Sequence, residues 1–324
     1  MYQNPKNKIG FKIRKFISDI YRDSDIGYSI LRPFYKLYEL GLRIMPDEFI
    51  IKRSFKKHMG YDLDLDNPKT LNEKINWLKL NNRKPIQTIL ADKYKVREYV
   101  KNKIGDKYLI PLLFETKNVK DIVPENLPEP SFIIKANHNS SGGLIVRDKS
   151  KVDWKKAQKR FKRLLRENHY YSTIEWQYKD IEPRIIVEQL LTHDDGSIPE
   201  DIKFHCFNGK VGFVMVDFDR FGKLRTRNLY DPNWNLIPSN WGRPNGRNME
   251  KPSNLDEMIT VAEKLAEDFA YVRVDLYLVK SQIYFGELTF YHASGFQAFY
   301  KRKSDRMFGD MLDISAIKNK SNPE

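Results

Sequence analysis

The stretches Arg273–Val274–Asp275–Leu276–Tyr277 and Tyr284–Phe285–Gly286–Glu287–Leu288–Thr289 decide the fold of this chain. Both are apolar and aromatic enough to form strands, and the short polar break between them has the length of a hairpin turn. Centring the hairpin on Ser281 places Asp275 opposite Glu287, and opposed residues of an antiparallel pair project from the same face. Two facing carboxylates repel each other, so a proton, a cation or a basic side chain has to compensate them. We favour a divalent metal ion.

Strand alternation adds two more side chains to this face. Arg273 lies on the same face as Asp275, and Thr289 lies on the same face as Glu287. The hairpin therefore presents an arginine, two carboxylates and a hydroxyl together. A solvated strand face with a cross-strand ion pair would produce the same pattern, so the rest of the chain has to decide between the two interpretations.

The composition favours a globular protein, and its net charge favours an anionic binding partner. The 324 residues are 40% hydrophobic and 13% aromatic, enough for one elaborated domain or two. No apolar run approaches ~18 residues and the N-terminus lacks a signal-peptide core, so we expect a cytoplasmic protein. Its one cysteine, Cys206, excludes an internal disulfide. The net charge of +14 favours phosphates, an acidic polymer or an anionic membrane surface. We expect no nucleic-acid partner, because no nucleic-acid-binding motif appears.

The basic character is concentrated in residues 1–60, which hold 13 Lys/Arg against 6 Asp/Glu. Apolar residues recur at helical spacing from Ile9 to Tyr21 and again from Ile30 to Leu42. Two interpretations stay open for these basic amphipathic helices. They form a helical cap packed on the main body, or they make a peripheral contact with the inner face of an anionic membrane.

A loop with features of a phosphate site follows the helical region. Thr70 and Glu73 form a capping box that predicts a helix from Leu71 to about Leu80. The sequence also predicts a helix at roughly 92–103, a short strand at Tyr108–Pro111 and a basic helix at 151–169. Further on, the strand 132–135 runs into the polar, glycine-ended loop 136–143. Free backbone N–H groups in the loop, with Lys135 at its base, suit phosphate. Most loops of this kind are only turns.

The next segments are a buried strand and then an antiparallel meander of three strands, 202–207, 211–217 and 224–230. The apolar run 184–191 carries Glu188, which needs a hydrogen-bond donor such as a purine amine or a ribose hydroxyl if it is buried. Asn208–Gly209 predicts a tight hairpin. Lys203 alternates with Asp201 and His205 on one face, which points toward a site or toward water.

A long loop and one more helix lead back to the opening hairpin. Arg243 and Arg247 lie in the loop 231–252, where they would clamp a carboxylate. Ser253 and Asp256 predict a second capping box, which begins a helix through about Phe269.

The order of these features resembles the ATP-grasp fold. Three motifs, Thr70–Leu71–Asn72–Glu73–Lys74–Ile75–Asn76–Trp77, Lys203–Phe204–His205–Cys206–Phe207–Asn208–Gly209–Lys210 and Gly286–Glu287–Leu288–Thr289–Phe290, resemble its teichuronopeptide-biosynthesis (TupA-like) branch, whose members accompany surface-polysaccharide genes. The resemblance spans roughly residues 63–308. It implies an α+β fold in which two lobes sandwich ATP. The implied divisions are a basic helical N-terminal extension (1–62), a helical and α/β region (63–125), a small lobe with the phosphate loop (126–191) and a large lobe with the metal site (192–324).

The resemblance also implies roles for single residues. Asp275 and Glu287 match the carboxylates that hold Mg²⁺, and Thr289 stands where ATP-grasp enzymes commonly have Asn. Arg273 matches the arginine that steadies the transferring phosphoryl group, and Lys203 matches a second nucleotide-contacting lysine. The implied phosphate contacts are Lys135, Ser140, Ser141, Gly142 and Gly143, and the implied adenine hinge is Glu188, Gln189 and Leu190.

The implied function is an ATP- and Mg²⁺-dependent carboxylate–amine ligase that forms an amide through an acyl phosphate. Its expected partners are an amine or amino acid and an anionic sugar, such as a uronic acid of a cell-surface polysaccharide or its precursor. A sugar kinase or phosphotransferase would use the same nucleotide site. A glycosyltransferase ranks lower, because Asp275-x-Tyr277 is a poor substitute for a paired Asp-x-Asp. A basic binding protein for nucleic acid or acidic glycan has only the +14 charge in its favour.

Overall fold

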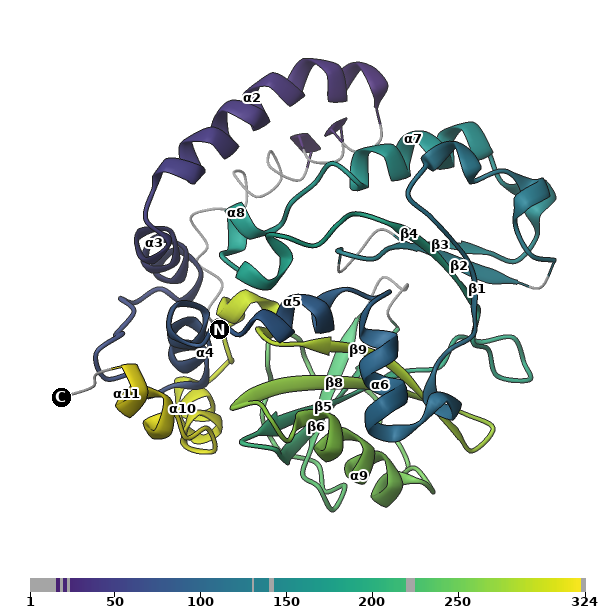
Figure 1. Ribbon diagram of the computed structural model, residues 1–324. Helices are drawn as coiled ribbons and strands as arrows, with labels where there is room; N and C mark the ends of the chain where they lie inside the picture. Colours follow the sequence, from purple (N-terminus) through teal and green to yellow (C-terminus); the bar gives the residue numbers. More distant parts are fainter. Residues whose placement is uncertain are drawn as a thin grey trace.

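The computed structural model describes residues 16–17, 20–21, 24–129, 131–139, 143–219 and 225–321. In this part of the chain the strands form two antiparallel sheets, one ordered β1-β4-β2-β3 and the other β7-β6-β5-β8-β9 (Figure 1). The strands are β1 (Leu112–Thr116), β2 (Phe132–Ala136), β3 (Leu144–Val146), β4 (Ile185–Gln189), β5 (Asp201–Phe207), β6 (Lys210–Phe218), β7 (Thr226–Tyr230), β8 (Tyr271–Val279) and β9 (Gln282–Thr289). The fold class is α+β, as the sequence predicts.

Helices surround both sheets. The α-helices are α2 (Asp25–Ile44), α3 (Asp47–Met59), α4 (Leu71–Asn81), α5 (Pro85–Ala91), α6 (Val96–Ile104), α7 (Trp154–Leu164), α8 (Tyr170–Thr173), α9 (Leu255–Ala266), α10 (Arg302–Asp310) and α11 (Ser315–Ser321). Short 3-10 helices are η2 (Asp106–Tyr108), η3 (Val119–Asp121), η4 (Pro124–Asn126), η5 (Lys149–Lys151), η6 (Trp176–Tyr178) and η7 (His292–Gly295).

Each sheet has one apolar face against a helix and one polar face turned inward. In the five-stranded sheet, Phe204 and Val274 join the core that includes α9, and Cys206 lies against the Ala262 carbonyl of that helix. In the four-stranded sheet, Ile134 and Val187 join a second core that includes Phe161 of α7. Figure 1 shows α7 above the first sheet and α9 below the second. Since side chains alternate between faces, Lys203, Asp275, Lys135 and Glu188 point toward the middle of the molecule.

In the hairpin of β8 and β9, Asp275 pairs with Glu287 as predicted, but a β-bulge is needed to produce this pairing. The turn consists of Lys280 and Ser281, both with positive φ (+50° and +63°), so it is one residue shorter than the predicted break. A register shift after Asp275 leaves Gly286 as the extra residue of β9, and this shift brings Asp275 opposite Glu287. The hairpin after β5 is also confirmed, since Asn208 and Gly209 both have positive φ.

Of the two capping boxes that the sequence predicts, one is present in the structure and the other is absent. At α4 the predicted capping box is present, with Thr70 accepting from the Glu73 N–H. The second predicted capping box is wrong, because Asn254 is the N-cap of α9 and no side chain caps it. The Ser253 hydroxyl instead donates to Asn254 Oδ1 at 2.8 Å.

Other predicted elements are moved or shortened. The predicted strand at Tyr108–Pro111 is wrong, because Tyr108 ends η2 and Leu109 forms only an isolated bridge with Phe285. The predicted helix at 92–103 begins at Val96, after Asp92 accepts hydrogen bonds from the Tyr94 and Lys95 N–H groups in a turn. The basic helix predicted at 151–169 is confirmed only over 154–164.

The N-terminal part of the chain adds a small core of its own. Ile50, Ile51 and Phe55 of α3 are buried with Leu42 of α2 and Tyr170 of α8. The first helix predicted there, Ile9 to Tyr21, lies largely outside the described residues, whereas the second is α2. Among the described helices, none combines the length and the apolar character needed to cross a bilayer. The four-stranded sheet takes β1 from the predicted 63–125 region, and the division into domains stays a prediction.

Candidate active site

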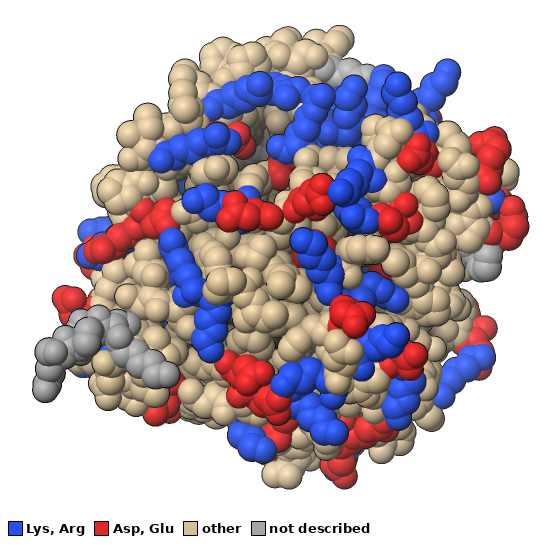
Figure 2. Space-filling view, in the orientation of Figure 1, with Lys and Arg blue, Asp and Glu red and all other residues tan. Residues whose placement is uncertain are grey.

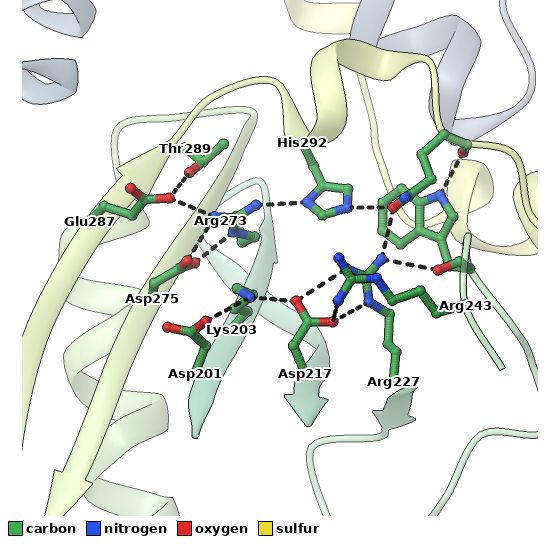
Figure 3. Close-up of polar contacts among 12 residues, drawn as sticks. Asp201, Lys203, Asp217, Arg227, Arg243, Arg273, Asp275, Glu287, Thr289 and His292 are labelled. Carbon is green, nitrogen blue, oxygen red and sulfur yellow. Dashed lines mark hydrogen bonds and ion pairs between the residues drawn. The ribbon is translucent and has the colours of Figure 1, made fainter. Parts of the chain in front are cut away.

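A row of charged side chains crosses three neighbouring strands. Lys203 of β5 pairs in register with Asp275 of β8, and Asp275 pairs with Glu287 of β9. In the next row, His205 pairs with Arg273, and Arg273 pairs with Thr289. The five large-lobe residues predicted from the sequence are therefore brought together on one face of the sheet (Figure 3). The polar face lies opposite α9, so the row points toward the four-stranded sheet.

Arg273 compensates the paired carboxylates. Its Nε and Nη2 donate to the two oxygens of Asp275 at 2.6 and 2.7 Å, and Nη2 also donates to Glu287 Oε1 at 2.8 Å. Thr289 donates to the same Glu287 oxygen at 3.1 Å. The sequence left open whether a proton, a cation or a basic side chain compensates the two carboxylates, and in the structure a basic side chain does so.

The pKa values of Asp275 and Arg273 follow from their burial and from the charges around them. Burial raises the pKa of Asp275 to about 6, against the opposing attraction of Arg273. Burial by itself would lower the pKa of Arg273, but the charges of Asp275 and Glu287 outweigh it and raise that pKa instead. Arg273 therefore stays charged, and Asp275 is a carboxylate at neutral pH.

A second ionic cluster lies beside the first. Lys203 Nζ donates to Asp217 at 2.5 Å and to Asp201 at 3.3 Å. Arg227 of β7 donates to both oxygens of Asp217, at 2.6 and 3.1 Å. Burial would raise the pKa of Asp217, but the charges of Lys203 and Arg227 hold it well below its usual range.

The long loop 231–252 contributes one of its two predicted arginines. Arg243 Nη1 comes within 3.5 Å of Asp217 Oδ1, so the loop reaches the cluster. Arg247 instead forms an exposed ion pair with Glu200. The predicted carboxylate clamp is therefore not formed by the two arginines together.

Sequence reasoning missed the two residues that join these clusters. His292 Nδ1 accepts from Arg273 Nη1 at 2.7 Å, and its Nε2 lies 3.3 Å from Gln297 Oε1. The same Gln297 oxygen accepts from Arg227 at 2.7 Å. Burial, followed by the Arg273 charge, lowers the pKa of His292 well below its ordinary value, so the ring is neutral and Nε2 donates to Gln297. Both residues follow β9 in a segment with no recognisable periodicity, so no sequence signal identified them.

His205 is the other buried histidine on this face. Its Nδ1 contacts the Tyr271 hydroxyl at 2.9 Å, and its Nε2 has no hydrogen-bond partner among the described residues. Burial, then the nearby Arg273, lowers the pKa of His205 well below its ordinary value. The ring is neutral and stacks on Phe213, with centroids 4.3 Å apart.

Lys93 connects this site to the glycine-ended loop, and no sequence pattern indicated this role either. Its Nζ donates to the Asn139 carbonyl at 2.9 Å and lies 3.5 Å from Glu287 Oε2. Asn139 is the last described residue before the predicted phosphate-binding positions Ser140, Ser141 and Gly142, which lie outside the described residues. Gly143 follows them, and a Cβ placed there would come within 3.3 Å of Ile133 Cδ1.

The small-lobe candidates form a separate group. Lys135 Nζ donates to Glu188 Oε2 at 2.7 Å, and Arg97 approaches Glu188 Oε1 at 3.4 Å. The donors that buried Glu188 requires are thus supplied by the protein.

The two residues after Glu188 already use their backbone N–H groups. Gln189 donates to the Pro111 carbonyl at 3.0 Å, and Leu190 donates to the Ser131 carbonyl at 3.1 Å. The Gln189 side chain is exposed, whereas Leu190 is buried. An adenine base bound by this segment would therefore contact atoms other than these two N–H groups.

A family model described as TupA-like ATP-grasp matches residues 73–313. The chain belongs to this family. The match contains the whole charged row and the small-lobe group.

Solved ATP-grasp structures resemble the chain at low identity. D-alanine–D-alanine ligase from Bacillus anthracis is 18% identical over 62% of this chain and 57% of its own length, with a TM-score of 0.38. The ATP-grasp ligase PsnB, solved with its minimal precursor, Mg and ADP, is 10% identical over 78% and 67%, with a TM-score of 0.38. N5-carboxyaminoimidazole ribonucleotide synthetase is 12% identical over 67% and 50%, with a TM-score of 0.39. The chain thus spans a little over half of the first ligase. No curated protein matches significantly.

The residues at the site fit magnesium by their donor chemistry. Asp275, Glu287 and Thr289 offer carboxylate and hydroxyl oxygens, the hard ligands that Mg²⁺ takes. Within the described residues no cluster of three or more His, Cys, Asp or Glu side chains is arranged to hold a metal. A small carboxylate set agrees with the usual Mg²⁺ site of nucleotide enzymes, which is completed by water and phosphate oxygens.

Proposed function

We propose that this protein is a carboxylate–amine ligase that activates its carboxylate as an acyl phosphate. A carboxylate oxygen attacks the γ-phosphorus of ATP, and ADP leaves. The nitrogen of an amine then attacks the acyl carbon and loses a proton, and inorganic phosphate departs to leave an amide. Family membership supports the reaction class.

The observation that carries this proposal is the Asp275–Arg273–Glu287 arrangement. Bound Mg²⁺ would draw charge from the phosphate oxygens during transfer. Asp275 and Glu287 would hold that ion, with Thr289 orienting Glu287. Arg273 is buried beside both carboxylates and always charged, so it would stabilise the charge that develops on the transferring phosphoryl group.

Lysines from both lobes supply further positive charge. Lys203 lies in register beside Asp275, and Lys93 lies between Glu287 and the Asn139 carbonyl. Lys135 extends from the opposite sheet near the loop that contains Ser140, Ser141, Gly142 and Gly143. We assign Lys135 and this loop to the phosphates of ATP. The segment Glu188–Leu190 is assigned to the adenine side.

The carboxylate that we propose is a uronic acid of a cell-surface polysaccharide or its precursor, and the amine is an amino acid or related amine. The basic composition of the chain suits an anionic acceptor. Arg243 already lies near the carboxylate of Asp217, and its side chain is only partly buried. It is therefore in a position to contact a carboxylate of the substrate as well.

The test uses hydroxylamine as the amine, because it converts any acyl phosphate into a stable hydroxamate. Full-length protein, Mg-ATP and a panel of uronic and amino acids are mixed, and ADP release and hydroxamate formation are measured. A ligase produces both in equal amounts with the correct acid. A sugar kinase releases ADP, produces no hydroxamate and leaves a product heavier by one phosphate.

The residue assignments are tested with Glu287→Gln and Asp275→Asn. Each substitution is expected to lower ADP release by about 100-fold or more, since each removes a charge that the transferring group requires. Glu267→Gln is the matched control, because Glu267 lies on the surface in an ion pair with Lys103. Wild-type turnover by both site variants would remove the metal assignment.

A further inference from the structure

The outer side of α2 carries an uninterrupted row of exposed apolar side chains. Their spacing of three or four residues places them on one side of the helix. The row, called here the α2 seam, consists of Ile26 (74% exposed), Ile30 (59%), Phe34 (68%), Leu37 (68%), Leu40 (54%) and Ile44 (79%). Soluble proteins seldom leave so many large apolar side chains adjacent and exposed, so the seam indicates a binding surface.

The other side of the same helix is attached to the protein. Leu42 is buried with α3, and the Arg43 guanidinium lies 4.4 Å from the ring centroid of Tyr171. Near the start of the helix, Arg163 of α7 lies over the ring of Tyr28 at 4.5 Å. The helix is thus held with its seam turned away from the body of the protein.

Positive charge borders the inner side of the seam. Arg32, Lys36 and Arg43 follow one flank of α2 at near-helical spacing. The neighbouring α7 contains six basic residues and no acidic residue, namely Lys155, Lys156, Lys159, Arg160, Lys162 and Arg163. Figure 2 shows Lys and Arg gathered over α7 and along the inner edge of α2, whereas uncharged residues cover the outer side of α2. An apolar stripe bordered by cations matches a lipid surface that carries negative headgroups.

We infer that α2 docks the enzyme on an anionic membrane surface. The seam enters the boundary between headgroups and acyl chains, and the cations of α2 and α7 contact the headgroups. A symmetric contact with a second copy fits less well, because it would bring the same basic residues of both copies together. The inference is independent of the proposed reaction, since neither helix contributes to the charged row.

The experiment is flotation of the full-length protein with lipid vesicles, without nucleotide. Vesicles of phosphatidylcholine alone are compared with vesicles that contain a substantial fraction of phosphatidylglycerol. We expect binding to the anionic vesicles, weaker binding at high salt, and little binding to neutral ones. Equal binding to both vesicles, or to neither, would overturn the inference.

Two pairs of variants separate the apolar and the charged contributions. Ile30→Ser with Leu37→Ser is expected to weaken vesicle partition by more than about tenfold. Lys155→Gln with Lys156→Gln is expected to weaken it by about tenfold. The matched controls are Met307→Ser on α10, which is 44% exposed, and Lys264→Gln on α9, and both should bind as wild type.

Solution size and ADP release provide the remaining outcomes. Sedimentation without lipid should give a monomer for wild type and for the seam variant. A wild-type dimer that Ile30→Ser with Leu37→Ser dissociates would assign the seam to a second copy and refute the membrane contact. Unchanged ADP release by the seam variant in solution would show that the variant is folded. A loss of vesicle binding could then be attributed to the missing apolar side chains.

Discussion

Arg273 donates from one guanidinium to both oxygens of Asp275 and to Glu287, the residue that faces Asp275 across the hairpin. The positive charge of Arg273 thereby offsets the repulsion between the two opposed carboxylates. The same arginine is held from behind by neutral His292. The arrangement keeps two anionic groups and one cationic group together on a buried surface, which is the charge pattern that the proposed Mg²⁺-assisted phosphoryl transfer would use.

Removal of the arginine should make the hairpin dependent on metal. In Arg273→Met the two carboxylates lose their compensating charge, and the free energy of unfolding should fall by about 3–5 kcal/mol. Mg²⁺ should restore part of this loss by binding between them. The measurement is thermal unfolding with and without Mg²⁺, and Arg306→Met is the control because Arg306 forms an exposed ion pair with Asp310. An unfolding temperature of Arg273→Met that ignores Mg²⁺ would contradict the metal assignment.

The bulge at Gly286 should tolerate no side chain. A Cβ at this position would lie 3.0 Å from the Asp275 carbonyl oxygen and 3.0 Å from the Tyr277 ring. Gly286→Ala should therefore destabilise the protein by about 1–3 kcal/mol. It should also lower ADP release, because the backbone movement that relieves these contacts moves Asp275 relative to Glu287.

Gly41→Ala in α2 is the control for this substitution, since no atom lies within 4 Å of its added Cβ. It should be neutral or stabilising by up to about 1 kcal/mol. Urea unfolding and steady-state ADP release measure both variants. Equal behaviour of the two alanine variants would mean that the bulge does not set the register.

The Asp217 cluster should stabilise the protein at all pH values above the acid range. Lys203 and Arg227 hold the pKa of Asp217 low, so the folded state binds its proton less tightly than the unfolded state. The resulting stability is present above the unfolded pKa of about 4 and is lost only as the pH falls through the lower folded value. Asp217→Asn should cost about 3–5 kcal/mol, because it removes the carboxylate charge that two buried cations share. The difference from wild type, measured by urea unfolding, should stay constant between pH 5.5 and 8, and a strong slope there would contradict this account.

Asp305 should show the opposite pH dependence. It accepts hydrogen bonds from the backbone and side chain of Asn72 at 3.0 and 2.9 Å, which attaches α10 to α4. Burial raises its pKa to about 6, so the folded state binds the proton more tightly than the unfolded state. This contribution is complete below the unfolded pKa of about 4 and is lost as the pH rises through about 6.

The corresponding variant is Asp305→Asn, which does not titrate. Relative to wild type it should gain on the order of 2–3 kcal/mol in unfolding free energy between pH 4 and pH 7. Urea unfolding at pH 5.0 and pH 7.5 samples part of this change. A difference from wild type that is equal at the two pH values would show that Asp305 does not titrate in this range.

Much of the site was predictable because it is encoded locally. Asp275 and Glu287 are joined by one short turn, and period-two alternation then places Arg273 and Thr289 beside them. Asn208–Gly209 has the residues that a tight hairpin requires, and its pairing carries Lys203 into the sheet. Prediction failed where local rules compete, as at Ser253, whose hydroxyl contacts the neighbouring Asn254 side chain.

The sequence by itself determined most of the strands, the positions of the hairpins and the face that carries the two carboxylates, because turn chemistry and alternation act over a few residues. Only the tertiary structure decided which distant residues connect this face to the rest of the site. Lys93 meets Asn139 across 46 residues, and Arg227 meets Gln297 across 70. Such contacts depend on how two sheets and their loops pack, and no local pattern in the chain records that packing. The outward seam of α2 has the same origin, since periodicity reveals an apolar side but packing decides whether it is covered.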